Sequence, residues 1–201
     1  RNHSSAASDV YKRQQYKDRF IQQDGRVIDL STPPGITTSE GQVYALLRAV
    51  WMQDRPTFER VLQWTRANLA QADAPLLAWK WGQKPDTSWG IIDAHTASDA
   101  DIQLALALFM AAEQWHHPPF AAQAVQVAQA VWKTEVIHVG SRYYLLPGNW
   151  AQEWNPTPLN LSYYAPAFFR VLQRFDPAHK WDQLVQTSYY LLKTRLPTTE
   201  L

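Results

Sequence analysis

The sequence predicts an all-α fold in which the helices come in pairs. Apolar residues recur at helical spacing in six segments, and short turns join these segments two by two. Irregular stretches rich in tryptophan separate one pair from the next. The chain has 201 residues, 46% of them hydrophobic, which is enough for one domain with a buried core. Helix pairs that wrap into a ring, with their loops gathered on one face, would form a toroid with a groove across it.

Two short elements are expected before the first pair: a helix over residues 16–22 and an extended piece over residues 26–29. The first pair is expected over residues 39–53 and 56–70, because Pro56 suits the first turn of a helix. The residues expected on one face of its first helix are Tyr44, Leu47, Val50 and Trp51.

The second pair is expected over residues 98–114 and 120–134, with Pro118 and Pro119 ending the first of these helices. Residues 136–146 then predict a short β pair that turns at Gly140-Ser141.

The third pair is expected over residues 164–175 and 179–195. Two stretches, residues 71–97 and 147–160, are predicted to be loops. A loop as long as the first of these is usually functional when it lies within a compact domain.

Two carboxylates stand where helices are expected to begin. Glu40 precedes one apolar helical run and Asp99 precedes another. Glycosidic bonds are usually cleaved by a pair of acidic side chains, so the pair favours an enzyme that acts on polysaccharide. Each acid also has a structural explanation: Thr37-x-x-Glu40 fits a capping box, and Asp99 follows Thr96 at a similar cap-like spacing. Asp101 is expected to be structural.

The ten tryptophans divide by location. Those in predicted helices are expected in the core: Trp51, Trp64, Trp115, Trp132 and Trp181. Those in predicted loops offer flat apolar faces on which sugar rings stack, and about half of them are expected to do so. The loop tryptophans are Trp79, Trp81, Trp89, Trp150 and Trp154.

Composition excludes several other classes of protein. The net charge is +1 with no basic block, which argues against a nucleic-acid partner. The longest apolar run, residues 104–112, is too short to span a membrane. There is no cysteine and no phosphate-binding glycine loop, and His116-His117 lacks further ligands at metal-binding spacing. We therefore expect no cofactor and no metal.

The motifs together resemble glycoside hydrolase family 8, and most closely the cellulases encoded with bacterial cellulose synthase. The resemblance covers roughly residues 15–195 and rests on these stretches: Gly25-Arg26-Val27-Ile28-Asp29, Thr37-Thr38-Ser39-Glu40-Gly41-Gln42, Ala78-Trp79-Lys80-Trp81-Gly82, Ser88-Trp89-Gly90, Ala97-Ser98-Asp99-Ala100-Asp101-Ile102, Leu145-Leu146-Pro147-Gly148 and Asn160-Leu161-Ser162-Tyr163-Tyr164.

The resemblance implies an (α/α)6 toroid of six inner and six outer helices, of which this chain would hold the first half as three helical hairpins. It implies that Glu40 is the proton donor of an inverting reaction on β-1,4-glucan, and that Asp99 holds the distorted sugar. Tyr163 would help to position the general base. Trp79, Trp81 and Trp89 would bind substrate.

The same resemblance places the general base beyond Leu201, so the chain is expected to be an N-terminal fragment that is inactive by itself. Residues 1–14 are interpreted as a leader unrelated to the fold, and residues 15–201 as part of the catalytic domain. A periplasmic or extracellular location, cellulose as the partner and a functional link to cellulose synthase are implied. His95 stands where the family usually has Asn. The alternative is a non-catalytic helical-repeat module that binds carbohydrate or protein.

Overall fold

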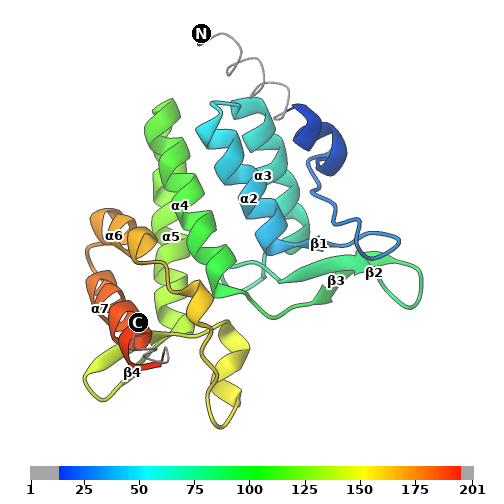
Figure 1. The fold of residues 1–201 in the computed structure, drawn as a ribbon. Helices are drawn as coiled ribbons and strands as arrows, with labels where there is room; N and C mark the ends of the chain where they lie inside the picture. The colour runs from blue at the N-terminus through cyan, green and yellow to red at the C-terminus, as the bar shows by residue number, and fades with distance from the viewer. Residues whose placement is uncertain (1–13, 196–201) are drawn as a thin grey trace, which may run out of the picture.

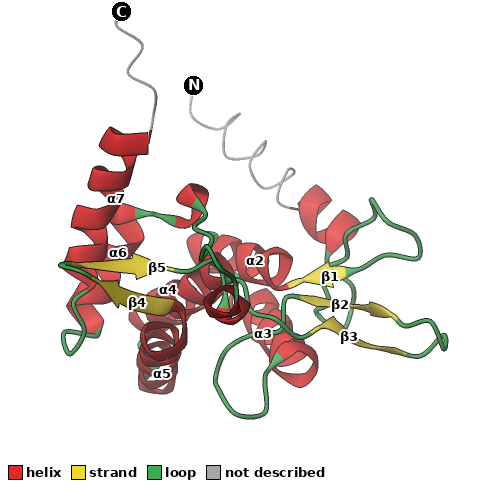
Figure 2. Cartoon of the chain, turned by 90° about the horizontal axis from the view of Figure 1, so that it is seen from below, coloured by secondary structure: helices red, strands yellow, loops and turns green. Residues whose placement is uncertain are grey.

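The computed structural model describes residues 14–195 and is mostly helical, with two small sheets (Figures 1 and 2). The predicted helix pairs are confirmed, with ends that differ by up to two residues from those expected. The helices are α2 (Ser39–Trp51), α3 (Arg55–Leu69), α4 (Ser98–Trp115), α5 (Pro118–Glu135), α6 (Pro166–Phe175) and α7 (Trp181–Arg195). Residues 14–20 form a further short helical segment. The leader expected at residues 1–14 lies, apart from Gln14, outside the described residues.

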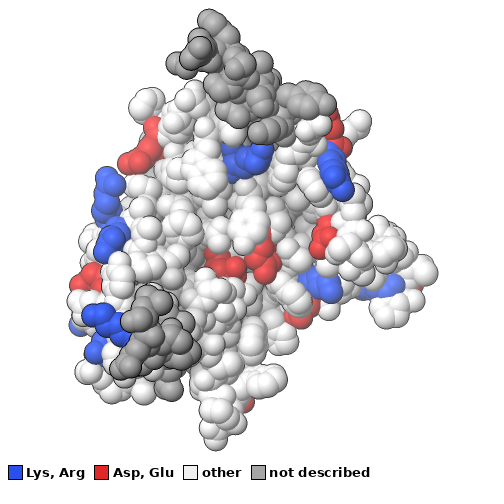
Figure 3. All heavy atoms as spheres, in the orientation of Figure 1, with Lys and Arg blue, Asp and Glu red and all other residues white. Residues whose placement is uncertain are grey.

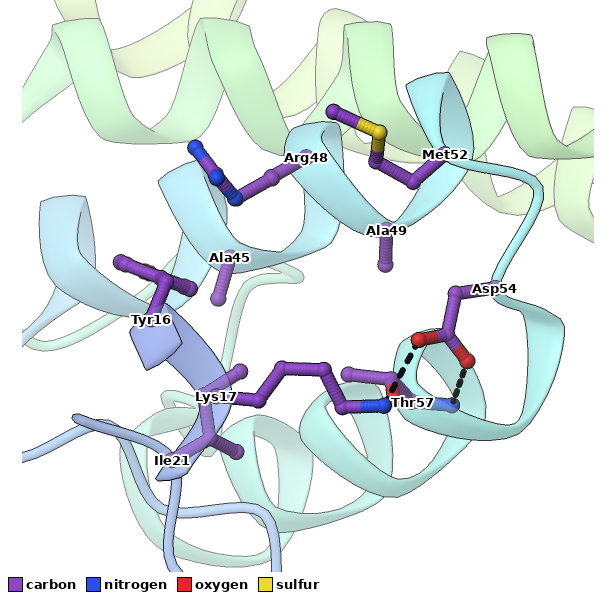
Figure 4. A pocket seen from close by; sticks show the side chains of 9 residues that line it. All are labelled: Tyr16, Lys17, Ile21, Ala45, Arg48, Ala49, Met52, Asp54 and Thr57. Atoms are coloured by element: carbon purple, nitrogen blue, oxygen red, sulfur yellow. Dashed lines mark hydrogen bonds and ion pairs between the residues drawn. The ribbon is translucent and has the colours of Figure 1, made fainter. Parts of the chain in front are cut away.

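The first pair begins at well-formed caps. The Thr38 hydroxyl accepts a hydrogen bond from the Gly41 backbone N–H at 3.2 Å, which satisfies one free donor of α2. Asp54 caps α3 by accepting from the Thr57 N–H at 3.3 Å. The same carboxylate pairs with Lys17 at 2.8 Å, so the N-terminal segment is tied to the turn between α2 and α3 (Figure 4).

α4 is the central helix of the three pairs, lying against α2, α5 and α6 (Figure 1). Its buried positions run almost around its circumference and include several alanines, among them Ala100, Ala105 and Ala107, all fully buried. Small side chains let neighbouring helices approach closely and pack to high density. The N-terminal turn of α4 is therefore held in the middle of the molecule.

The stretch expected to be a loop at residues 71–97 instead contains a β-hairpin, so that prediction was wrong. Strands β2 (Lys80–Gln83) and β3 (Trp89–Asp93) pair antiparallel, and β1 (Thr37–Thr38) adds a third strand just before α2. The hairpin lies beside the first helix pair (Figure 2). Its strands are short and their burial does not alternate regularly, so the sequence pattern of the segment gives little signal.

The predicted β pair at residues 136–146 is confirmed as β4 (Val136–Val139) and β5 (Arg142–Leu145). Gly140 supplies the left-handed conformation of the turn, with a φ of 62°. The Tyr164 hydroxyl donates to the Leu145 carbonyl and accepts from its N–H, both at 2.9 Å, so the chain before α6 is fixed to this hairpin.

Two expectations for α2 were wrong. Trp51 is 62% exposed and Tyr44 is 50% exposed, so neither belongs to the core. The buried stripe of the helix is formed by Val43, Leu46, Leu47 and Val50. Tyr44 and Trp51 are seven residues apart and share a different stripe, turned away from that core.

The other helical tryptophans follow the prediction. Trp64 and Trp181 are buried, whereas Trp115 and Trp132 are half-buried and pack against the core. Trp181 also donates from its indole Nε1 to the buried Asp176 carboxylate at 2.9 Å. Among residues 14–195, none of the helices combines the length and the apolar character needed to cross a membrane.

Candidate active site

Glu40 lies in the first turn of α2, and its side chain is held from two sides. One oxygen accepts from the Trp79 indole Nε1 at 3.2 Å, and the other accepts from the Ser39 hydroxyl at 3.1 Å. The Ser39 N–H in turn donates to the Trp79 carbonyl at 2.9 Å. The start of α2 therefore fixes both the backbone and the ring of Trp79 beside the Glu40 carboxyl.

The capping-box explanation for Glu40 was wrong. Thr38, and not Thr37, caps α2. The Thr37 hydroxyl points inward, accepting from Arg26 Nε at 2.8 Å and donating to the Val27 carbonyl at 2.8 Å. Glu40 is thus left to face Trp79 instead of closing its own helix.

Asp99 is half-buried in the first turn of α4, close to Glu40. Burial and the negative charge of Glu40 raise the pKa of Asp99 to about 6, although backbone N–H groups and the Tyr163 side chain favour its charged form. The cap-like explanation was wrong here too: Ala97 occupies the cap position, and the Thr96 hydroxyl donates to Glu135. Acidic side chains lie together near the centre of one face, over the N-terminal ends of α2 and α4 (Figures 1 and 3).

A cavity of about 530 Å³ opens beside Glu40. It is lined by Glu40, Trp79, Asp93, His95, Thr96, Ala97, Pro147, Trp150, Pro158, Leu159, Asn160 and Tyr163. A second hollow, of about 240 Å³, is lined by Asp99 and also reaches Tyr163. Tyr163 therefore borders both spaces, with Glu40 on the larger cavity and Asp99 on the smaller hollow.

Tyr163 ends a short 3-10 helix, η2 (Leu161–Tyr163), and its hydroxyl favours the charged form of Asp99. Burial and the charges of Asp99 and Glu40 raise the pKa of Tyr163 to about 12. The phenol therefore keeps its proton at neutral pH and can donate it in a hydrogen bond to Asp99.

Of the predicted sugar-binding tryptophans, the structure brings only Trp79 to this cavity. Trp81 and Trp89 stack on each other, with ring centroids 5.2 Å apart. The Arg26 guanidinium lies 4.6 Å and 4.9 Å from the centroids of these two rings. Neither ring lines the cavity. Trp150 does line it, although the choice among the loop tryptophans could not be made from sequence.

Sequence reasoning missed a second polar pair in the cavity wall. His95 Nδ1 lies 2.9 Å from Asp93 Oδ1, and the His95 ring meets the edge of Trp150 at 6.5 Å. Asp93 is the last residue of β3 and His95 follows two residues later, so a predicted strand end would have indicated this pair. The strand itself was not predicted.

Within residues 14–195, no group of three or more His, Cys, Asp or Glu side chains is arranged to hold a metal ion. His116 is the left-handed C-cap of α4, with a φ of 49°, and the His117 ring packs on Phe120 at 4.4 Å. These histidines thus form the turn of a helical hairpin.

Acidic residues in the first turns of two helices, with an exposed indole and a cavity beside one of them, are the arrangement that the sequence motifs predicted for a helical glycoside hydrolase. The family model described as "Glycosyl hydrolases family 8" matches residues 2–200, and the chain belongs to this family.

Relatives and solved structures agree with this assignment. The chain is 37% identical to an endoglucanase of Salmonella typhi, in an alignment that covers 92% of this chain and 50% of that protein. It is 36% identical to an endoglucanase of Pseudomonas fluorescens, in an alignment that covers 89% of this chain and 46% of that protein. It resembles the crystal structure of an endo-1,4-D-glucanase from Vibrio fischeri with a TM-score of 0.83 and 34% identity, covering 92% of this chain and 55% of the other. The chain spans about half the length of the curated relatives it matches.

Proposed function

We propose that this chain carries the proton-donating part of the active site of an inverting endo-β-1,4-glucanase. The observation that supports this most directly is that Glu40 and Asp99 lie in the first turns of α2 and α4, where the charge of Glu40 raises the pKa of Asp99, with Trp79 bonded to Glu40. A non-catalytic helical-repeat scaffold gives no reason for two acids from separate helix pairs to meet beside an indole.

In the proposed reaction, Glu40 protonates the oxygen of the leaving sugar. Trp79 both orients this carboxyl through its Nε1–H and offers a ring face to the substrate. Asp99, which lines the smaller hollow together with Tyr163, would hold the sugar on the other side of the cleaved bond in its distorted form.

An inverting reaction also needs a base that activates water on the opposite face of the sugar, with the two carboxyls about 6.5–9.5 Å apart. We propose that this base lies outside residues 1–201 and that the three helix pairs form the first half of an (α/α)6 ring. Residues 15–201 would then belong to one catalytic domain. Trp81 and Trp89 would contact sugar units farther along the glucan, because Trp89 is 42% exposed and so is accessible to a ligand.

The names of the relatives favour a β-1,4-linked glucan as the substrate, and we extend the proposal to cellulose. A periplasmic or extracellular location and a link to cellulose synthase form part of the same proposal. No cofactor has a role in it.

The test is the release of reducing ends from a soluble β-1,4-glucan by the full-length enzyme that contains these residues. Glu40→Gln is expected to abolish most turnover, because the amide occupies the same space and has no acidic proton to give. Glu113→Gln, an exposed change on α4, is the matched control. Unchanged turnover in the Glu40 variant would exclude this assignment.

The 201-residue chain alone is expected to bind glucan weakly and to turn over little, because one proton-transfer partner is missing. Robust turnover by this chain would place the base within its own residues.

A further inference from the structure

Arg26 is a buried cation beside the β2–β3 hairpin, and the proposed reaction gives it no role. Its exposed fraction is 7%. Among residues 14–195, the ion pairs involve other cations, and Arg26 pairs with no acid. Burying a charge is costly unless other groups replace the water that it loses. The groups that surround Arg26 therefore indicate what it does.

Hydrogen bonds hold Arg26 at both its backbone and its side chain. The backbone N–H donates to Asp24 Oδ1 at 3.0 Å, and the carbonyl accepts from the Gln22 N–H at 2.8 Å. The Nε–H donates to the Thr37 hydroxyl at 2.8 Å, and Nη2 donates to the Gly35 carbonyl at 2.9 Å. The position of the guanidinium is therefore fixed relative to β1.

The guanidinium forms a three-membered cluster with the rings of Trp81 and Trp89. The two ring centroids are 5.2 Å apart with an interplanar angle of 26°, and the guanidinium carbon lies 4.6 Å and 4.9 Å from them. The three separations are nearly equal, so each group contacts the other two. A planar cation is attracted to aromatic rings, and Arg26 therefore favours the arrangement in which both indoles stay together.

This cluster connects an exposed ring to the hydrophobic core. The edge of the buried Trp64 ring meets Trp81 with centroids 5.3 Å apart. Trp89, in contrast, is 42% exposed and lies on β3, which is an edge strand with a neighbouring strand on one side only. The orientation of the Trp89 ring therefore depends on its contacts with Trp81 and Arg26.

We propose that Arg26 is a positioning residue that holds Trp81 and Trp89 as a preformed aromatic platform for an extended glucan. The sugar ligand rests on the proposed function, whereas the arrangement of the three groups does not. A ring that is already ordered loses less conformational freedom when a ligand binds, so a preformed platform binds more tightly than a mobile ring.

The platform lies at a distance from the cavity that sets the length of the ligand. Asp93 lines the cavity and ends β3, whereas Trp89 begins the same strand. A strand of this length spans about 13 Å. The β2–β3 hairpin also projects beyond the first helix pair (Figures 1 and 2). A disaccharide can fill the cavity alone, and only a longer oligosaccharide contacts both places.

Circular dichroism of the 201-residue chain tests the positioning role. Two indoles stacked at 5.2 Å couple their electronic transitions and give paired bands of opposite sign, which the difference between wild type and Trp89→Phe isolates. Arg26→Lys keeps the charge but lacks the planar group, so it is expected to lose most of this signal. Trp51→Phe, at a ring that is 62% exposed and outside the cluster, is the matched control and should retain it.

A full signal in Arg26→Lys, or its absence in the wild-type chain, would overturn the positioning role. If Arg26→Lys does not fold, proton NMR of the wild-type chain decides. The Cδ protons of Arg26 are expected to be shifted upfield by the two indole rings, and Trp89→Phe should reduce this shift. Ordinary chemical shifts for these protons would refute the cluster.

Calorimetric binding of cellohexaose and cellobiose to the same chain tests the platform. Trp89→Ala and Arg26→Lys are each expected to weaken cellohexaose binding by roughly 3- to 10-fold and to leave cellobiose binding unchanged. The double variant should bind cellohexaose no more weakly than Trp89→Ala alone, because Arg26 acts through that ring.

Additive losses in the double variant would refute the action of Arg26 through Trp89. Equal losses for both sugars, no loss for either, or a wild-type chain that binds neither would refute the platform. None of these results depends on Glu40, so a failed platform leaves the Glu40→Gln test of function intact. Full turnover in Glu40→Gln would likewise leave the dichroism result standing.

Discussion

Replacing Asp99 by asparagine is expected to make the folded chain more stable at neutral pH, although it removes a proposed functional group. Burial and the charge of Glu40 raise the pKa of Asp99 from its ordinary 3.8 to about 6. The folded protein therefore binds this proton more tightly than the unfolded chain does. The contribution of this carboxyl to stability is therefore fully present below about pH 4 and is lost as the pH rises through about 6, where the carboxyl ionises in the folded protein.

One unit of pKa corresponds to about 1.4 kcal/mol, so the full shift would cost the folded state about 3 kcal/mol at neutral pH. Asp99 is only partly buried, and solvent screens part of the charge, so the expected gain for Asp99→Asn at about pH 7 is about 1–3 kcal/mol. The asparagine oxygen can still accept the hydrogen bond from Tyr163. Below about pH 4 the gain should vanish, because the carboxyl is then neutral in both states.

Urea unfolding followed by circular dichroism, repeated between about pH 4 and pH 8, measures this difference directly. Asp73→Asn, a change at an exposed carboxyl, is the control and should leave the free energy of unfolding almost unchanged. If Asp99→Asn lowers the stability at pH 7, or raises it equally at both ends of the range, the electrostatic account of this site is refuted.

Three further predictions concern the same site. In Glu40→Gln, loss of the negative charge should lower the pKa of Asp99 from about 6 towards its ordinary value, as 13C NMR titration of the aspartate carboxyls would show. An unchanged pKa of Asp99 would show that the two carboxyls do not interact. Tyr163→Phe removes a donor that favours the charged form, so the pKa of Asp99 should rise above about 6 in the same titration. Trp79→Phe keeps a ring but loses the Nε1–H bond to Glu40, and binding of soluble cello-oligosaccharides, followed by calorimetry, should weaken by about 1 kcal/mol; unchanged binding would mean that the indole N–H does not shape the site.

The helices could be predicted from sequence because each has its own local evidence. Apolar spacing marks all six, and Pro56 and Pro118-Pro119 mark two of the beginnings. The strands of the β2–β3 hairpin were missed because they are short and their buried and exposed residues do not alternate. The pairing of Thr37 with Trp81 is non-local, because a complete helix pair lies between them in the sequence, and a pattern confined to one segment does not indicate such a partner.

The capping errors have a simple physical origin. Thr37 and Thr38 are adjacent and chemically alike, and a shift of one residue changes which of them caps α2. Arg26 donates a hydrogen bond to the Thr37 hydroxyl, so Thr37 is engaged in the interior and Thr38 caps the helix. The proximity of Glu40 to Asp99 likewise depends on how α2 packs against α4, and sequence spacing alone does not contain it.

The environment of Asp99 also shows which electrostatic effect prevails at the start of α4. The helix dipole favours a negative charge there, typically by less than about 1 kcal/mol at an exposed site. Burial and the Glu40 charge act in the opposite direction, and the raised pKa shows that they are the larger effect. Asp101 and Glu135, deeper in the same region, have raised pKa values as well. Three acids therefore occupy places where ionisation costs stability, and apolar residues of similar size would make a pure scaffold more stable. Asp99 lies at one of these places and has a role in the proposed reaction, so the stability that it costs there is a physical reason to prefer the catalytic proposal over the scaffold.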